Sequence, residues 1–169
     1  MKHILRAAVP DDQPFLWQML YYAAHMDEGD EPRESARTNP DLAPYVEGFG
    51  RPDDRGVIAL EAATGTRAGA AWIRRMPPAW PLYRFVDASA PELAIAVAPA
   101  RIGRGAGSLM LTRLLADAAA IHPAIVLSVR ANNPARSLYE RLGFTVVAEI
   151  TNRVGSRSLI MKVALTPSR

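Results

Sequence analysis

The sequence predicts an α/β fold, with helices on both faces of one sheet, in a single domain spanning residues 1–169. Three observations support this class. Short apolar runs of period two alternate with runs of helical period along the chain. A strand, a glycine-rich turn and a helix follow one another in the middle of the sequence, as in a strand-helix-strand unit. The length of 169 residues and the 49% hydrophobic content suffice for one domain with a sizeable core.

The first half of the chain gives three short strands and one clear helix. Leu16, Met19 and Leu20 recur at helical spacing behind Asp11 and Asp12, which we expect to cap that helix. The stretch MDEGDEPRES is acidic and irregular, and RMPPAWPLYRF is a loop because it is rich in proline. The remaining expected elements are strands at residues 4–6, 57–61 and 68–74 and a short helix at residues 41–49.

The second half is more regular. In PELAIAVAP, Leu93, Ile95 and Val97 alternate with alanines, so this strand has one bulky face and one smooth face. The next helix carries its apolar stripe at residues 111–118. The remaining expected elements are a buried strand at residues 125–129, a helix that begins behind Asn133 and Pro134 and stops at Gly143, and paired strands at residues 144–150 and 157–165.

Composition excludes several classes of protein. The chain has no cysteine, which rules out disulfides and thiolate metal sites and fits a reducing cytoplasm. The start MKHILRAAVPDD reaches acid and proline too soon for a signal peptide, and no apolar run is long enough to span a membrane. The arginines are scattered and the net charge is only +3, which gives little support to nucleic-acid binding. Finally, His3, His25 and His122 lack metal-ligand spacing, so no metal is expected.

The turn after the smooth strand is the most informative local feature. Gly103, Gly105 and Gly107 lie between that strand and a helix whose first N–H groups lack partners and carry the positive end of the helix dipole. Glycines let a phosphate approach such groups without meeting a Cβ, and Arg101 and Arg104 add positive charge. The turn therefore indicates a phosphate-bearing ligand, with a tight turn without a ligand as the alternative.

Two common phosphate loops do not fit this turn. A Walker loop requires Gly-Lys-Ser/Thr, whereas Gly107 is followed by Ser108 and Leu109. A dinucleotide loop requires a third glycine where Ser108 stands and an acidic residue after the following strand. A nucleotide-binding domain of either kind is therefore disfavoured.

Two longer motifs are more specific. The run V-A-P-A-R-I-G-R-G-A-G, residues 97–107, resembles the acyl-CoA-binding motif of the GCN5-related N-acetyltransferase (GNAT) superfamily. Downstream, N-x-x-A-x-x-L-Y-E-x-x-G-F, residues 132–144, is similar to the second signature of that superfamily. One departure is that Ile102 stands at the usual Arg/Gln position, with Arg101 one place earlier. The resemblance implies a mixed, mostly antiparallel sheet with a splayed central strand, and acetyl-CoA as co-substrate.

The resemblance also implies which residues hold the coenzyme. The pantetheine arm is expected to pair with backbone groups near Ile95 and Val97, in the gap beside the splayed strand. The side chain of Asn132 is expected to bond to the coenzyme, with helix capping as its alternative role. The pyrophosphate is expected on the turn formed by Ile102, Gly103, Arg104, Gly105, Ala106, Gly107 and Ser108.

N-acetyl transfer requires a neutral amine, a stabilised oxyanion and a proton for the departing thiolate. The resemblance assigns the acid to Tyr139, with a merely packed tyrosine as the alternative. Glu92 is the only acid on the central strand, where the resemblance implies a base or a water-orienting carboxylate. It lies five residues before Val97, whereas the corresponding acid of the family lies six before. On a regular strand Glu92 therefore faces the opposite side from that acid, unless a bulge restores the register. Two alternatives remain open. An amine that arrives partly in its neutral form could attack directly while water carries its proton away, and Glu92 could be a solvated residue.

The acceptor side is the least specified part of the sequence. Aromatic residues together with the acidic stretch at residues 27–34 could form a cage for an amine acceptor of cationic character. Such residues are more often ordinary core and a solvated run of charge. The aromatic candidates are Trp17, Tyr21, Tyr45, Trp80, Tyr83 and Phe85. The alternative function is a non-catalytic acyl-CoA-binding sensor or interaction module. The oligomeric state stays open, a homodimer included.

Overall fold

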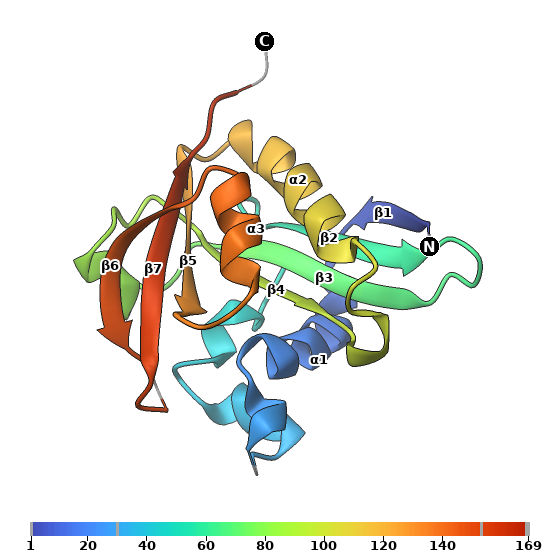
Figure 1. Ribbon diagram of the computed structural model, residues 1–169, viewed down its shortest axis with the longest axis horizontal. Helices are drawn as coiled ribbons and strands as arrows, with labels where there is room; N and C mark the ends of the chain where they lie inside the picture. The colour runs from blue at the N-terminus through green and yellow to red at the C-terminus, as the bar shows by residue number, and fades with distance from the viewer. Residues whose placement is uncertain (1, 30, 153, 168–169) are drawn as a thin grey trace.

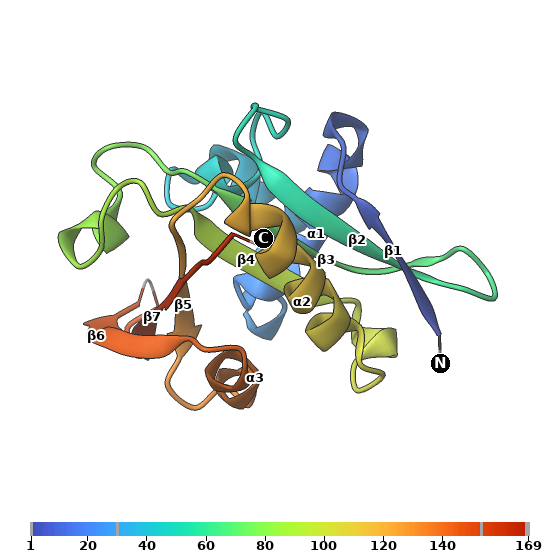
Figure 2. The ribbon, with the colours of Figure 1, turned by 90° about the horizontal axis from the view of Figure 1, so that it is seen from above.

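One seven-stranded sheet runs through the molecule in the order β1-β2-β3-β4-β5-β7-β6 (Figures 1 and 2). The computed structural model describes residues 2–29, 31–152 and 154–167. The strands are β1 (His3–Ala7), β2 (Arg55–Glu61), β3 (Arg67–Arg74), β4 (Glu92–Val97), β5 (Ala124–Arg130), β6 (Thr145–Thr151) and β7 (Arg157–Ala164). The α-helices are α1 (Gln13–Ala23), α2 (Ala106–Ala119) and α3 (Ala135–Arg141). The strands and helices predicted in the second half of the sequence are confirmed.

The sheet consists of two antiparallel halves that meet at a single place. Strands β1 to β4 pair antiparallel in chain order, and β5, β7 and β6 form the other antiparallel half. Between the halves, β4 and β5 are parallel, and within the described chain their register holds the one pair Glu92 and Val126. Beyond that pair the two strands separate, which confirms the mostly antiparallel sheet with a splayed central strand.

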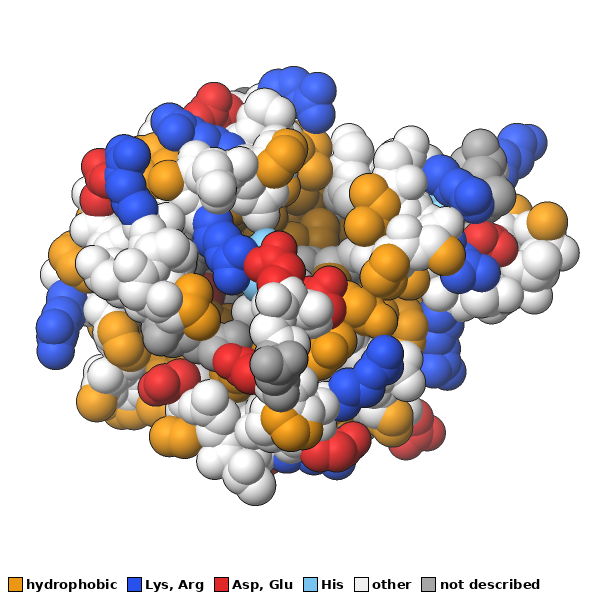
Figure 3. Space-filling view, turned by 60° about the horizontal axis from the view of Figure 1, so that its bottom comes forward, with side chains coloured by type: hydrophobic (Ala, Val, Ile, Leu, Met, Phe, Trp, Pro, Cys, Tyr) orange, Lys and Arg blue, Asp and Glu red, His pale blue; other side chains and the backbone are white. Residues whose placement is uncertain are grey.

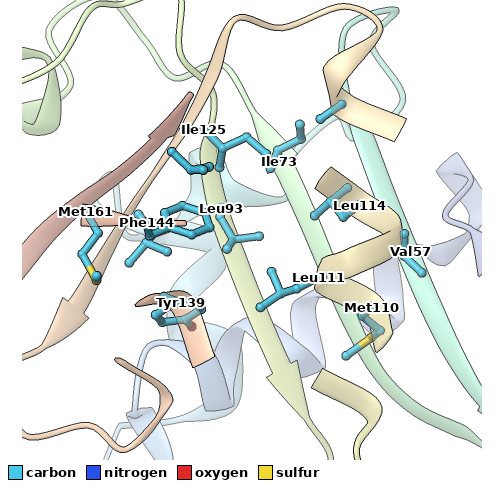
Figure 4. Close-up of a cluster of buried hydrophobic side chains, with 14 of the residues drawn as sticks. Val57, Ile73, Leu93, Met110, Leu111, Leu114, Ile125, Tyr139, Phe144 and Met161 are labelled. Atoms are coloured by element: carbon cyan, nitrogen blue, oxygen red, sulfur yellow. The ribbon is translucent and has the colours of Figure 1, made fainter. Parts of the chain in front are cut away.

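Helices cover both faces of the sheet, as predicted. On one face, α2 and α3 pack on the bulky side of β4, where Leu111, Tyr139 and Phe144 share a cluster with Leu93 (Figure 4). On the other face, α1 packs on the smooth side of β4, where Ala94 joins the second cluster. In Figure 1, α2 lies above β2 to β4 and α1 lies below them.

Two local expectations about the first half are wrong. The carboxylate of Asp12 makes no capping bond to α1, because it accepts two bonds from the guanidinium of Arg6 at 2.8 Å and another from the N–H of Val9. The helix expected at residues 41–49 is a single 3₁₀ turn, η4 (Ala43–Tyr45), followed by turns. The acidic stretch holds two further 3₁₀ helices, η2 (Met26–Glu28) and η3 (Arg33–Thr38), and the proline-rich loop holds η5 (Pro81–Arg84).

Candidate active site

A cleft of about 1020 Å³ lies where β4 and β5 separate. Its walls come from the end of α1 and η2, from η4 and η5, from β4, from the glycine turn and from the ends of β5 and α3. Figure 3 shows a hollow with hydrophobic side chains at its floor and with acidic, basic and histidine side chains beside it. Segments far apart in the sequence therefore form one site.

The glycine turn presents free backbone donors to this cleft. The first hydrogen bond of α2 runs from Leu109 N–H to the carbonyl of Gly105, so the N–H groups of the three residues between them have no partner within the helix. Gly103 and Gly105 both adopt φ +84°, a left-handed conformation that favours glycine, and no atom lies within 4 Å of where their Cβ atoms would stand. Gly107 instead lies inside α2, facing Leu138 of α3.

The two arginines of the turn contact a carboxylate of β2. Arg101 Nε donates to Glu61 Oε1 at 2.6 Å, and Arg104 Nη1 lies 3.8 Å from the same oxygen. Arg101 and Ile102 both line the cleft, and the side chain of Ile102 is 67% exposed. The ion pair anchors the turn to the β2–β3 hairpin, and Glu61 offsets part of the positive charge that the sequence led us to expect there.

The edge of β4 that faces β5 also carries unpaired backbone groups. Ala98 N–H donates to Ala68 on the β3 side, and the carbonyl of Pro91 accepts from Val126 on the β5 side. Backbone direction alternates along a strand, so the N–H and C=O groups of Ile95 and Val97 also face β5. Because β5 has already diverged there, these groups line the cleft rather than a ladder.

The two asparagines before α3 differ in their placement. Asn133 lines the cleft, and its Oδ1 accepts a bond from Ala135 N–H at 2.9 Å, which fulfils the capping role predicted for it. Asn132 is exposed and lies outside the residues that line the cleft. Arg104 lies outside the lining as well. The remaining coenzyme candidates all line it: Ile95, Val97, Ile102, Gly103, Gly105, Ala106, Gly107 and Ser108.

Tyr139 projects from α3 into the cluster between that helix and the sheet. Its ring packs edge-on against Phe144, with centroids 5.8 Å apart, and its side chain also lines the cleft (Figure 4). Burial raises the pKa of Tyr139 to about 12, so the hydroxyl keeps its proton at neutral pH. The phenol is therefore a proton donor rather than an acceptor in the resting protein.

Glu92 is only 2% exposed, so a solvated glutamate is the wrong interpretation of this residue. The ladder between β3 and β4 runs without interruption from Arg74–Glu92 to Gly69–Val97, so no bulge restores the register of Glu92 there. Trp80 Nε1 donates to Glu92 Oε1 at 2.8 Å, and the Tyr45 hydroxyl donates to Oε2. Burial raises the pKa of Glu92 to about 7 against the opposing effect of those two bonds.

The two candidate catalytic residues approach the cleft from opposite faces of the sheet. Glu92 shares the face of Ala94, which packs against the α1 cluster, whereas Leu93 shares the cluster of Tyr139. Glu92 also belongs to the register pair that joins β4 and β5 in the described part of the chain. The carboxylate thus stands at the closed end of the cleft.

The α1 side of the cleft holds part of the predicted acceptor set. Tyr45 and Trp80 line it and stack edge-on, with centroids 5.6 Å apart. The other four aromatic candidates lie outside the lining: Trp17, Tyr21, Tyr83 and Phe85. Among these, Trp17 and Tyr21 instead stack under Arg37 and Arg33.

The acidic stretch contributes less open charge than the sequence suggested. Asp27 and Glu28 line the cleft, joined by Asp41 from outside the stretch. Glu34 pairs instead with Arg37 at 2.9 Å, and Asp30 lies outside the described residues. Within the described part of the stretch, the carboxylates that line the cleft are therefore those of Asp27 and Glu28.

Sequence reasoning missed several polar residues of the cleft, Arg130 and His25 among them. Arg130 ends β5 and donates to Glu28, while His25 Nδ1 lies 3.6 Å from the same carboxylate with its backbone left-handed at φ 57°. Burial, with a smaller contribution from Arg130, lowers the pKa of His25. The contact between Arg130 and Glu28 joins residues 102 apart in sequence, so no local pattern points to it.

Two further properties bear on what the cleft binds. Within the described residues, no helix has the length and hydropathy needed to cross a bilayer. No group of three or more histidine, aspartate or glutamate side chains in those parts of the chain is arranged to hold a metal ion. The unpaired donors at the glycine turn are backbone N–H groups, which suit an anionic ligand.

Comparisons with known proteins point in one direction. A family model for the acetyltransferase (GNAT) domain matches residues 54–146, which hold the glycine turn and α3. The chain is similar in structure to a GNAT-family acetyltransferase from Streptococcus pneumoniae, with 20% identity, 97% of this chain and 99% of that chain covered, and a TM-score of 0.68. No curated protein matches the sequence significantly.

Two other structures have the same fold. Mutant forms of the spermidine/spermine N-acetyltransferase SpeG from Vibrio cholerae share 20% identity, with 96% of this chain and 95% of that chain covered and a TM-score of 0.64. Aminoglycoside acetyltransferase AAC(6')-Ib in complex with coenzyme A and kanamycin shares 19% identity, with 96% and 95% covered and a TM-score of 0.63.

Proposed function

This chain belongs to the GNAT family of acetyltransferases, and we propose that its cleft transfers an acetyl group from acetyl-CoA to the nitrogen of a cationic amine. Membership makes the protein an acyltransferase, and GNAT acetyltransferases use acetyl-CoA. The observation that carries the proposal is the cleft itself, with a phosphate cradle at its open end and Glu92 at its closed end.

The chain offers suitable groups for each part of coenzyme A. The free N–H groups of Ala106, Gly107 and Ser108, in front of the open space beside Gly105, suit a pyrophosphate. The unpaired backbone groups of Ile95 and Val97 suit the amides of a pantetheine arm, which would extend the sheet as an added strand. Bound acetyl-CoA supplies the activated thioester, and Tyr139 and Glu92 then act from opposite faces.

The roles of the two residues follow from their proton affinities. Tyr139 keeps its proton at neutral pH and would give it to the departing sulfur. Glu92, with a pKa of about 7, is poised near neutrality and would receive the proton of the ammonium group. A backbone N–H of β4 that faces the gap would stabilise the oxyanion.

The chemistry of the acceptor wall favours a cation. Asp27, Asp41 and Glu92 line the cleft on the side of α1, beside the aromatic pair of Tyr45 and Trp80. Similar structures include enzymes that acetylate spermidine and aminoglycosides, both of which are polycationic amines. We also propose that the whole chain forms one domain and works in a reducing cytoplasm, in keeping with its lack of cysteine.

Product analysis tests this function. The protein is incubated with acetyl-CoA and a library of amines, thiol release is followed, and products are identified by mass spectrometry. We expect one stoichiometric acetyl-amine per CoA released, and loss of turnover in Tyr139→Phe. Tight CoA binding without turnover on any amine would instead identify a non-catalytic CoA-binding module, and no CoA binding would overturn the proposal.

A further inference from the structure

The carboxylate of Glu92 is held by two donors from irregular segments. Tyr45 in η4 donates its hydroxyl to Oε2, and Trp80, just before η5, donates Nε1 to Oε1 at 2.8 Å. Each oxygen thus already accepts one hydrogen bond, and the residue is only 2% exposed. An acceptor amine in the cleft therefore has little direct access to the carboxylate.

Tyr45 is more accessible than Glu92. It is half-buried and lines the cleft beside Asp41 and Leu42. A phenol oxygen can donate one hydrogen bond and accept another. Because the Tyr45 proton points to Glu92, the oxygen retains a lone pair that this bond does not use.

The backbone around Tyr45 is fixed from β3. Trp72 Nε1 donates to the carbonyl of Tyr45 at 2.7 Å. Arg74 Nη1 donates to the carbonyls of Pro44 and Glu47 at 3.0 and 2.7 Å. The guanidinium of Arg74 is in turn held by Asp54, whose Oδ2 accepts from Nε at 3.1 Å. The hydroxyl is therefore preorganised on Glu92 before a substrate arrives.

We propose that Tyr45 is a further catalytic residue, which relays the proton of the acceptor ammonium group to Glu92. The inference rests on the proposed function, because it requires that the cleft acetylates an amine. It differs from direct base catalysis in that the amine contacts Tyr45 and not the carboxylate.

The relay conserves protons and charge. An N–H proton of the ammonium group moves to Tyr45 Oη while the proton of Tyr45 moves to Glu92 Oε2, which leaves a neutral amine, a neutral tyrosine and a protonated carboxyl group. The amine nitrogen then forms a bond to the thioester carbon. When the C–S bond breaks, the sulfur takes a proton from Tyr139, which regains the second N–H proton of the nitrogen. The sum is one amide, one thiol and one proton that Glu92 later releases to water.

Few other charges act on this relay. From β3, Arg74 lies opposite Glu92 in the ladder, but its guanidinium is engaged by Asp54 and two carbonyls. From the loop after η3, Asp41 raises the pKa of Tyr45 slightly, behind the larger effects of burial and of Glu92. From η5, Tyr83 faces the same carboxylate, and burial raises its pKa. Arg74 and Tyr83 keep their protons near neutral pH, whereas the pKa of Glu92 lies there.

The pH profile of Tyr45→Phe tests the relay, with n-propylamine as a probe small enough for any amine site. In the parent enzyme, kcat/KM for the amine should rise with Glu92 ionisation and level off above pH ~7, because the relay itself removes the ammonium proton. In Tyr45→Phe only free neutral amine reacts, so the rate should keep rising about tenfold per pH unit toward the pKa of the amine, about 10. At pH ~8 we expect a loss of about 10²-fold.

Two control variants separate the relay from simpler effects. Trp80→Phe also removes a donor from Glu92, so it should move the acid limb of the profile to higher pH while keeping the plateau, at a level at least tenfold above Tyr45→Phe. Tyr21→Phe changes a tyrosine outside the cleft that stacks with Arg33, and should match the parent. A plateau retained in Tyr45→Phe would overturn the relay and leave the proposed function standing.

A second measurement needs no turnover. In protein labelled with ¹³C-glutamate, the carboxyl resonance missing from Glu92→Gln should titrate with a midpoint of about 7. Its midpoint should rise in Tyr45→Phe, because the ionised carboxylate loses a donor. An unmoved midpoint overturns the relay. A parent that acetylates no amine overturns the proposed function and the relay together, whereas an active parent with an equally active Tyr45→Phe overturns the relay alone.

Discussion

Arg130 Nη1 donates to Glu28 Oε2 at 2.5 Å, and this pair joins the end of β5 to the turn after α1. The guanidinium lowers the pKa of Glu28, so the carboxylate is ionised at neutral pH but already paired. The carboxylates left to attract a cationic acceptor on this side are therefore Asp27 and Asp41. This arrangement changes which residues test the electrostatic capture of substrate.

The double variant Asp27→Asn, Asp41→Asn should raise KM for spermidine about threefold with little change in kcat, because exposed charges raise the encounter rate of a cation but not the rate of the chemical step. Steady-state kinetics at low and high salt measure it, since added salt screens the same field in the parent. Glu34→Gln, whose carboxylate is paired with Arg37 outside the cleft, is the control. An unchanged KM, or a best acceptor that is anionic, contradicts the idea.

Gly105→Val should weaken CoA binding at least tenfold, about 1.4 kcal/mol. The added side chain would enter open space before the free N–H groups of α2, at a left-handed φ of +84°. Calorimetric titration with CoA measures it. Gly65→Val carries the same backbone strain at φ +72° in the β2–β3 turn and should bind CoA like the parent. Equal losses in both variants would mean strain rather than a blocked phosphate.

Tyr139→Phe should retain the CoA affinity of the parent and lower kcat by about 10²-fold, the usual scale for one proton-transfer group. The ring, its packing on Phe144 and its place in the core remain, so only the hydroxyl is removed. Stopped-flow measurement of thiol release at saturating substrates checks the rate. An unchanged kcat would reduce Tyr139 to a packing residue.

Glu92→Gln should stabilise the protein at pH ~8. It should also abolish the rise in activity with a midpoint at pH ~7 in the pH profile. Burial raises the pKa of Glu92 from 4.5 to about 7. The contribution of this group to the free energy of unfolding is therefore fully present below pH 4.5 and is lost as the pH rises to about 7. The ionised carboxylate then costs about 3 kcal/mol, which a neutral amide avoids while it keeps partners for Tyr45 and Trp80.

Thermal melts at pH ~4.5 and ~8 measure this effect, and the gain should vanish at the lower pH. Glu61→Gln is the matched control with opposite sign. Hydrogen bonds from Thr64 and Arg101 lower the pKa of Glu61, so its loss should destabilise the protein at pH ~8. Equal melting temperatures for parent and Glu92→Gln at pH ~8 would contradict the raised pKa.

The glycine turn and α3 could be predicted because their signals are local. Gly105 and Gly143 take the left-handed conformations that only glycine adopts freely. Asn133 caps α3 by accepting a hydrogen bond from the backbone N–H of Ala135, two residues further along the chain. Each of these features depends on a few neighbouring residues. The alternation of bulky and small residues in β4 likewise assigned its two faces, which pack against α3 and α1.

The environment of Glu92 could not be predicted in the same way. Its partners, Tyr45 and Trp80, lie 47 and 12 residues away in segments without periodicity. The alternation of residues along a strand predicts which face of the sheet a side chain lies on, but not which segments cover that face. A solvated glutamate was therefore also consistent with the sequence. The helix expected at residues 41–49 failed for a related reason, because tertiary bonds from Arg74 and Trp72 hold that segment in another shape.

The junction between the two half-sheets has a consequence for folding thermodynamics. Since β4 and β5 share the one register pair at Glu92 and Val126 in the described chain, few backbone hydrogen bonds couple the halves. A pantetheine arm bonded to β4 would supply hydrogen bonds in the gap between the two half-sheets. Binding of the coenzyme should therefore make unfolding of the two halves more cooperative. Without coenzyme, the two halves should exchange amide hydrogens as separate units. With coenzyme, the amides of Ile95 and Val97 should slow together with those of β5, and the melt should sharpen into one transition.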